Sequence, residues 1–572
     1  MTEKLPVPAE PPERSRQSGR IPEREAAETG GAQRAGTPPE GRSRAATDTR
    51  PGETVSAGHP PYLPPTPPSP LYAGAYPYKP SLPDLRREPP STVNTDVLWA
   101  ALATGVLSMV LLNDGMGANL FLVALPAAVT AYFAARQAGR VQARPWTLSW
   151  GIGGLALLLV PAVRAAQWPS LLAVATAIGL ASLALHGSRT WSGVVLSPLG
   201  LLDSLPKGAR WGWRGVRTRA GNASGSLGSA LRALAVTAVL LLVFGALFAG
   251  ADAAFADLLS RMVPDTSVGD GPWRLVLFAL GVFGALAAAH TAAAPLRWDS
   301  LKTSPGRARG RAEWALPLLV LCVLFAVFNA IQLAVLFGGY KAVLDKTGQT
   351  YSEYARQGFW QLLFATLLTL LVIVFALRWA PRRGPGDRNL VRGVLGTLCA
   401  LTLVVVASAV RRMGMYVEAY GLTRLRISVV TVELWLGLVI LLIMAAGVWG
   451  ARWLPRAVAA SAAAVALAFG LASPDGLIAE NNVRRYEKTH NFDLDYARGL
   501  SADAVPALDR LREPMRSCVL GPLAKGLGPA TASWYETSWG EVRARQILKE
   551  RPPTTTDPGT CFSSGESTEY DR

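Results

Sequence analysis

Long apolar stretches, separated by short polar and basic segments, dominate the chain from about residue 95 to residue 472. A helix needs about 20 residues to cross the hydrocarbon core of a bilayer, and most of these stretches approach that length. They predict membrane-spanning helices over residues 97–112, 118–135, 148–163, 168–186, 231–250, 273–294, 315–337, 358–379, 390–410, 428–450 and 455–472. The pattern therefore predicts an all-α fold, a polytopic α-helical membrane bundle of about 11 transmembrane helices over residues 95–472.

The clearest spans form a pair between residues 313 and 379. The first reads EWALPLLVLCVLFAVFNAIQLAVLFGG, and the second reads QGFWQLLFATLLTLLVIVFALRW. The polar linker between them is short, which predicts two antiparallel helices. Thr350 and Glu353 in this linker have the spacing of a capping box, so the second helix is expected to begin near Thr350.

The segment before the spans, residues 1–94, is rich in proline and poor in apolar residues. It contains no apolar core of the kind that a signal peptide needs, so the first span is expected to act as an uncleaved anchor. Because such a composition leaves little to bury, we predict a disordered, proline-rich cytoplasmic tail with polyproline II stretches. The tail is either a ligand for a partner's aromatic groove or a solvated extension.

After residue 472 the composition becomes polar. This composition predicts a small extracytoplasmic region of short helices over residues 473–552 and a second disordered tail over residues 553–572. Ser538 and Glu541 have capping-box spacing, which predicts a helix that extends to about Lys549.

The net charge of +17 alone would be compatible with nucleic-acid binding. The lysines and arginines, however, concentrate in alternate loops between the spans, as the positive-inside rule describes. This distribution predicts a multi-pass plasma-membrane protein with a cytoplasmic N-terminus and an extracytoplasmic C-terminus, in contact with membrane lipids and not with nucleic acid. The loop between Arg411 and Arg426 is an exception, because it is basic on the predicted outer side.

Residues 187–230 form the longest predicted cytoplasmic loop. Trp211 and Trp213 lie among arginines in its middle. Aromatic and basic residues together favour the interface of an anionic leaflet, so we expect both indoles to lie on the inner membrane surface.

Four cysteines are present. Cys322 and Cys399 fall in apolar spans and are expected to pack as small core residues. Cys518 and Cys561 follow the spans; they are either a disulfide of an extracytoplasmic region or two unrelated thiols.

Polar side chains inside the spans are the candidate functional groups. Asn329 and Gln332 are three residues apart and share a helix face, where they either bind a polar cargo or headgroup or hydrogen-bond a neighbouring helix. Glu433 lies several residues inside the span 428–450. A carboxyl group there is costly, so it is either a functional group, for example in proton coupling, or it pairs with Arg424 or Arg426.

The chain lacks a GxxxxGK[ST] phosphate loop, HExxH, GxSxG and the kinase signatures. Asp493 and Asp495, close to His490, form a DxD pattern that by itself is a weak metal-binding signal. We therefore expect no enzyme activity, no cofactor and no metal site.

Five stretches resemble a known family: FGALFAGADAAFADLL from Phe244, the span from Glu313, TYSEYARQGFWQL from Thr350, MYVEAYGLTRLRI from Met415 and SPDGLIAENNVRRY from Ser473. The chain resembles, over roughly residues 95–515, uncharacterised bacterial integral membrane proteins of the domain of unknown function 4153/4173 type, best known from actinobacteria. The resemblance implies a multi-pass membrane protein and no particular activity.

Two functions fit these observations. The first is a non-enzymatic membrane scaffold, sensor or regulatory protein, whose protein partner binds the proline-rich tail or the C-terminal region. The alternative is a transporter or lipid-handling permease that uses Asn329, Gln332 and Glu433 around a cavity.

Overall fold

The computed structural model describes residues 88–112, 115–140, 145–222, 271–301, 307–338, 351–381, 383–527, 533–554 and 561, and a few single positions from 237 to 252. All described residues belong to Tyr78–Arg572, one of the two units into which the chain divides. Most of the predicted N-terminal tail, of the predicted span 231–250 and of the predicted tail 553–572 lies outside the described residues.

Helices are the regular elements of the described ranges, and nine of those described helical stretches are long and apolar enough to cross a membrane. They are α2 (Asn119–Gln137), α3 with α4 (Pro145–Leu157 and Val160–Val163), α5 (Gln167–His186), α9 (Gly271–Ala293), α10 (Arg311–Gly338), α12 (Tyr351–Trp379), α13 (Pro385–Tyr420), α14 (Arg424–Trp449) and α15 (Leu454–Leu471). A shorter apolar helix, α1, covers Thr95–Leu111. The all-α membrane fold is thus confirmed, whereas the count of about eleven spans is not.

The outer faces of these helices are apolar. On α10, the exposed side chains include Leu316, Val320, Val323 and Leu324. Such a continuous apolar surface would be unstable in water and is typical of contact with lipid. The chain is therefore an integral membrane protein.

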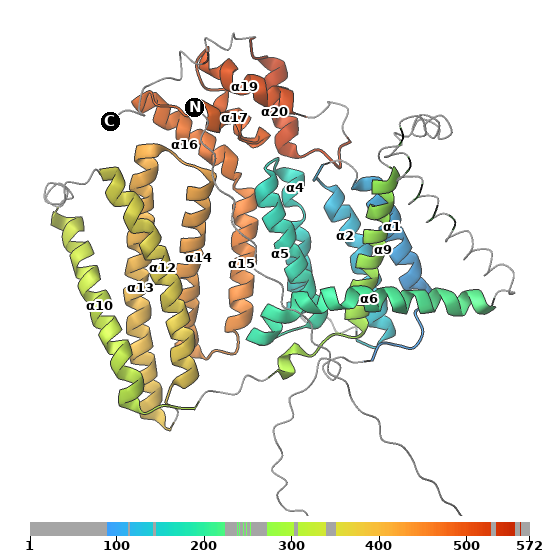
Figure 1. The fold of residues 1–572 in the computed structure, drawn as a ribbon, viewed down its shortest axis with the longest axis horizontal. Helices are drawn as coiled ribbons and strands as arrows, with labels where there is room; N and C mark the ends of the chain where they lie inside the picture. Colours follow the sequence, from blue (N-terminus) through green and yellow to red (C-terminus); the bar gives the residue numbers. More distant parts are fainter. Residues whose placement is uncertain are drawn as a thin grey trace, which may run out of the picture. The chain divides into compact units, whose positions relative to one another are not determined.

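The spanning helices pack in three groups (Figure 1). One contains α10, α12, α13 and α14, and its apolar core includes Ile373, Leu398 and Ile440. Another contains α1, α2 and α9, where Gly105 and Gly281 let α1 and α9 approach closely because a Cβ at either position would collide with the facing helix. Helices α3, α5 and α15 form a third contact group, and α15 also packs against α14.

The predicted cytoplasmic loop 187–230 is helical over most of its length. Helix α6 covers Trp191–Asn222 and packs across α9. Trp211 is buried against Val97 and Ala293 and donates from Nε1 to the Pro90 carbonyl oxygen at 2.9 Å, so its expected place on the membrane surface is wrong. Trp213, on the other side of the helix, is exposed.

The C-terminal region, residues 473–552, folds as short helices around a shared apolar core. They are α16 (Pro474–Thr489), α17 (Leu494–Arg498), the 3-10 turn η2 (Ala502–Ala504), α18 (Val505–Leu508), α19 (Met515–Gly526) and α20 (Trp539–Glu550). Ile478, Leu508 and Leu520 are central in the core. The predicted capping box is confirmed at its first half, because the Ser538 side chain accepts a hydrogen bond from the Glu541 amide.

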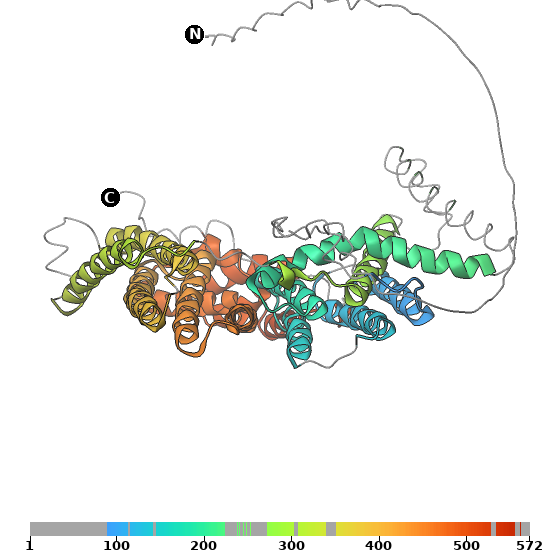
Figure 2. The same cartoon turned by 90° about the horizontal axis from the view of Figure 1, so that it is seen from below.

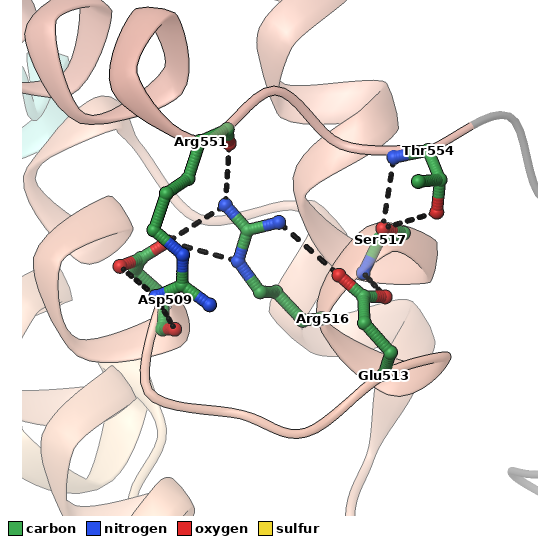
Figure 3. Close-up of polar contacts among 6 residues, drawn as sticks. All are labelled: Asp509, Glu513, Arg516, Ser517, Arg551 and Thr554. Carbon is green, nitrogen blue, oxygen red and sulfur yellow. Dashed lines mark hydrogen bonds and ion pairs between the residues drawn. The ribbon is translucent and has the colours of Figure 1, made fainter.

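Two sets of contacts join the last part of the C-terminal region to helix α19. A disulfide joins Cys518 to Cys561. The buried Arg516 side chain pairs with Asp509 and Glu513 and donates to the Arg551 carbonyl oxygen at 2.5 Å, as Figure 3 shows. These contacts fix the end of α20 against α19.

The DxD aspartates have structural partners. Asp493 caps α17 by accepting from the Tyr496 amide at 2.9 Å, and Asp495 pairs with Arg498 at 3.0 Å. Local helix capping and an ion pair therefore account for this pattern.

Candidate functional site

Four spanning helices place polar side chains inside one apolar bundle. We call this set the polar seam; its members come from α10, α12, α13 and α14 and are Asn329, Gln332, Thr366, Arg412 and Glu433. Around it lie apolar side chains such as Phe359, Ala409 and Leu436. The seam thus contains all three polar candidates that the sequence indicates, together with two residues that it does not.

Asn329 ties α10 to α13. Its Nδ2 donates to the Leu401 carbonyl oxygen at 2.9 Å, and its side chain is almost completely buried. Its Oδ1 has no hydrogen-bond partner within the described ranges. An amide that bonds a neighbouring helix stabilises the bundle modestly, by about 0.6 kcal/mol on average.

Gln332 makes the second tie between the same helices. Its Oε1 accepts from Arg412 Nη2 at 3.1 Å, and Arg412 is buried. The sequence reading ended the α13 span at residue 410 and placed Arg412 in an outer loop, whereas the helix continues to Tyr420. The sequence contains no helix-ending residue directly after residue 410 that would have supported the predicted boundary. Helix α13 ends at Gly421, which has a positive φ.

Glu433 is completely buried, and Thr366 on α12 is its hydrogen-bond partner. Thr366 Oγ1 lies 3.0 Å from Glu433 Oε1 and 3.1 Å from the Leu362 carbonyl oxygen. A hydroxyl has one proton, so both short contacts are satisfied together when the carboxyl group is protonated and donates to the hydroxyl. The described residues offer Oε2 no hydrogen-bond partner and Glu433 no ion pair.

The expected pairing of Glu433 with Arg424 or Arg426 is not found, because both arginines have other partners. Arg424 binds Asp475, and Arg426 donates to the Tyr420 and Gly421 carbonyl oxygens while its guanidinium lies 4.3 Å from the centre of the Tyr416 ring. These two arginines of the exceptional basic loop are therefore engaged in contacts at or beside the turn between α13 and α14.

A second polar cluster joins the C-terminal region to the spanning helices. We call it the Asp475 junction; it consists of Asp475, Arg424, Trp168 and Ser501. Asp475 is completely buried and accepts from Arg424 Nε at 2.9 Å and Nη2 at 2.6 Å, from Trp168 Nε1 at 3.1 Å and from the Ser501 amide at 2.9 Å. Burial alone would raise the pKa of Asp475, but these hydrogen bonds and the charge of Arg424 outweigh it and hold that pKa below its ordinary value.

Asp503 makes a further connection nearby. Its Oδ2 accepts from the amides of Ala165 and Ala166, at 2.9 and 3.1 Å, just before α5 begins. Burial raises the pKa of Asp503 above its ordinary value, although the Ala166 amide and the positive charge of Arg164 oppose this shift. The C-terminal region is thus bonded to the ends of both α5 and α14.

Asn482 on α16 adds a contact to the turn between α13 and α14. Its amide group accepts from the Leu422 N–H at 2.8 Å and donates to the Leu422 carbonyl oxygen at 3.0 Å. Gly421, in front of it, has a φ of +78°, and a Cβ there would lie 2.6 Å from Asn482 Oδ1. Glycine therefore meets both the backbone and the space requirement at this position.

We compared the sequence with models of known protein families. The family model described as "Domain of unknown function (DUF4153)" matches residues 151–511. The chain belongs to the DUF4153 family. No curated protein and no solved structure matches the chain.

Both polar clusters of this DUF4153 protein lie inside the matched range. The stretch MYVEAYGLTRLRI provides Arg424 and the Leu422 backbone, and SPDGLIAENNVRRY provides Asp475 and Asn482, so the two stretches meet at one interface. Helices α19 and α20 and the disulfide lie beyond the end of the match. The matched part therefore contains the attachment of the C-terminal region and only the first half of that region.

Proposed function

We propose that this DUF4153 protein is a non-enzymatic membrane scaffold or sensor whose extracytoplasmic C-terminal region is rigidly coupled to the helix bundle. The Asp475 junction is the observation that carries this proposal. A buried carboxylate with four N–H donors, two of them from a bidentate arginine, fixes the relative position of the elements that supply them. Those elements are α5, α14 and the C-terminal region, so a force or ligand acting on that region reaches the membrane helices directly.

The orientation that we propose places the C-terminal region outside and the N-terminal tail in the cytoplasm. Disulfides persist in oxidising compartments, so the bond between Cys518 and Cys561 supports an outer location. Basic side chains at the opposite helix ends support the same orientation through the positive-inside rule; examples are Arg307, Arg388, Arg392 and Arg452. The basic residues between Arg411 and Arg426 remain an exception to this rule in the proposed orientation.

The proposed partner is a protein that binds either the C-terminal region or the proline-rich tail. Trp534 and Trp539 of the C-terminal region are 73% and 65% exposed, and large exposed aromatic side chains favour protein contacts. Nucleic acid is not expected as a partner, because the excess positive charge is spread over membrane-flanking segments. No catalytic role is proposed, since the described polar clusters serve packing and attachment.

Genetic complementation tests this function. In a host whose own gene is deleted, the chain with Asp475→Ala should fail to restore the wild-type phenotype, and so should the chain cut after residue 472. The seam variant Asn329→Leu with Gln332→Leu should restore it if it inserts normally. Full rescue by the cut chain would refute the scaffold proposal.

Glu433 favours a second candidate function, a transporter or lipid-handling permease. A completely buried carboxyl group with one oxygen unbonded within the described ranges is a candidate for proton coupling. A groove of about 390 Å³ between α10 and α12 is lined by residues such as Trp314 and Trp379, and none of the seam residues lines it. In the same complementation assay, loss of rescue by Glu433→Gln at normal protein level would favour this candidate.

A further inference from the structure

Helix α6 has three distinct faces, and the first is packed against other parts of the protein, α9 among them. Small residues line this packed face; they include Gly193, Ser197, Gly200, Ser204, Gly208, Gly212 and Gly215. Gly193 and Gly200 lie against Asp299 and His186, and Gly215 lies against Val93. A Cβ on Gly208 would lie 2.6 Å from the Leu286 carbonyl oxygen, and a Cβ on Gly212 would lie 2.8 Å from Leu286 Cδ1. The glycines therefore let α6 lie in close backbone contact with α9.

The second face of α6 is apolar and exposed. The spacing of its side chains places them on one side of the helix, and each is 47–66% exposed. They are Trp191, Val195, Leu199, Leu202, Trp213 and Val216. A stripe of this length is too apolar to face water. A membrane is the nearest apolar medium, because the helix packs directly against spanning helices.

The third face is basic. Lys207, Arg210, Arg214 and Arg217 follow the same three- and four-residue spacing along one side of the helix, and all four are exposed. Asp203 is the only acidic residue of α6 and pairs with Lys207 at 2.7 Å. This side of the helix therefore presents excess positive charge beside the apolar stripe.

Both ends of α6 are fixed close to the ends of spanning segments. At the start, Asp299 Oδ1 accepts from the Thr190 amide at 3.0 Å and from its hydroxyl at 2.7 Å. Near the end, Arg219 donates to the Val93 carbonyl oxygen at 2.5 Å and to Thr95 Oγ1, at the beginning of α1. Figures 1 and 2 show that α6 runs across the axis of α9 rather than along it.

We propose that α6 lies in the plane of the inner leaflet and binds anionic phospholipids. Its apolar stripe enters the acyl-chain boundary, and its three exposed arginines bind headgroup phosphates, as amphipathic interfacial helices with basic polar faces do. The packed face lies against α9, α5 and η1, so all three faces have a partner. This proposal goes beyond the scaffold function and rests on it only for the orientation, which assigns α6 to the inner leaflet.

Native mass spectrometry of the full-length protein in mixed phosphatidylglycerol and phosphatidylcholine micelles tests the charge requirement. The variant Arg210→Gln, Arg214→Gln, Arg217→Gln should lose the preference for phosphatidylglycerol, by roughly tenfold or more, since each basic residue near a membrane surface contributes measurably to anionic-lipid binding. The matched control changes three exposed arginines of the C-terminal region to glutamine, Arg484, Arg512 and Arg543. An equal loss in the control, or no loss in the α6 variant, would overturn the proposal.

A nitroxide spin label tests the depth of the helix independently of charge. In phosphatidylglycerol vesicles, a label at Leu202→Cys should collide with oxygen and be protected from a water-soluble nickel complex, whereas a label at Arg214→Cys should show the reverse. Both variants are made in a chain whose buried Cys322 and Cys399 are alanine. Equal exposure of both labels to the nickel complex would show that α6 is not in the membrane.

Discussion

Two buried carboxyl groups, Glu433 and Asp475, differ sharply in their surroundings. Both are completely buried, and they lie on neighbouring helices, α14 and α16. Glu433 has a single hydroxyl as its partner, which suits a neutral acid, whereas Asp475 has four N–H donors, two of them from an arginine, which suits an anion. The comparison teaches that burial alone does not identify a functional acid; the donors around it determine its charge and its role.

The largest effect should follow from removing the carboxylate at the junction. Asp475→Ala leaves Arg424, Trp168 and the Ser501 amide without their acceptor, so we expect a loss of about 3 kcal/mol. This figure is at the low end for a buried ion pair because the Arg424 side chain is 39% exposed. Thermal unfolding in nanodiscs measures the loss, and Asp495→Ala, at an 84% exposed side chain, is the control that should change little.

A backbone change at the same interface should have a smaller effect. Gly421→Ala forces a side chain into a left-handed conformation and against Asn482 Oδ1, at a cost of about 1–3 kcal/mol. Gly139→Ala is a matched control, since Gly139 also has positive φ but has open space at its Cβ. A melting temperature that falls no further than in this control would show that the contact with Asn482 is unimportant.

Asp475 and the nearby Asp503 should give opposite dependence of stability on pH. The pKa of Asp475 is lowered on folding, so its stabilisation is present above the unfolded value of about 3.9 and is lost as the pH falls through the folded pKa. The pKa of Asp503 is raised on folding, so its contribution is present below that value and is lost as the pH rises through the folded pKa. The sum of these two opposing contributions is measured by the hydrogen-exchange protection of α16 between pH 3 and pH 6, corrected for intrinsic exchange rates.

Asp475→Asn separates the two contributions in that experiment. Without the Asp475 carboxylate, the protection of α16 should decrease as the pH rises from about 4, because only the Asp503 contribution remains. Protection that still rises with pH in this variant would mean that another acid controls the stability of the C-terminal region.

The smallest effect should follow from changes in the polar seam. Asn329→Leu removes one bond between α10 and α13, and we expect a loss of about 0.6 kcal/mol. Glu433→Gln keeps a neutral polar group beside Thr366 and should leave stability almost unchanged, as equilibrium unfolding in detergent can measure. If Glu433→Gln destabilised the protein as much as Asp475→Ala does, the proposed difference in role between the two buried carboxyl groups would be contradicted.

The membrane fold could be predicted from the sequence because a bilayer requires long apolar helices, and the pattern of such helices is visible without contacts. Asn329, Gln332 and Glu433 were found by the same principle, since polar residues stand out inside apolar spans. Arg412 was missed because an arginine after an apolar run reads as a loop residue. The charge pattern of α6 was visible, but which of Trp211 and Trp213 is buried depends on how α6 packs on α9.

The Asp475 junction could not be predicted in the same way. Arg424 and Asp475 are far apart in the sequence, and each is unremarkable in a polar segment beside a span. Trp168 is the first residue of a predicted span, and its bond to Asp475 depends on the packing of α5 beside the C-terminal region. Such partners are determined by tertiary contacts, which carry no local sequence signal.

Hydrogen-exchange mass spectrometry of Asp475→Ala in nanodiscs tests the coupling most directly. The account predicts faster exchange at residues 498–505 of the C-terminal region and also at residues 165–170, where α5 begins, while α10 and α13 keep their wild-type rates. If residues 498–505 open and residues 165–170 remain protected, the C-terminal region is attached without being coupled to the membrane helices, and the central claim is contradicted.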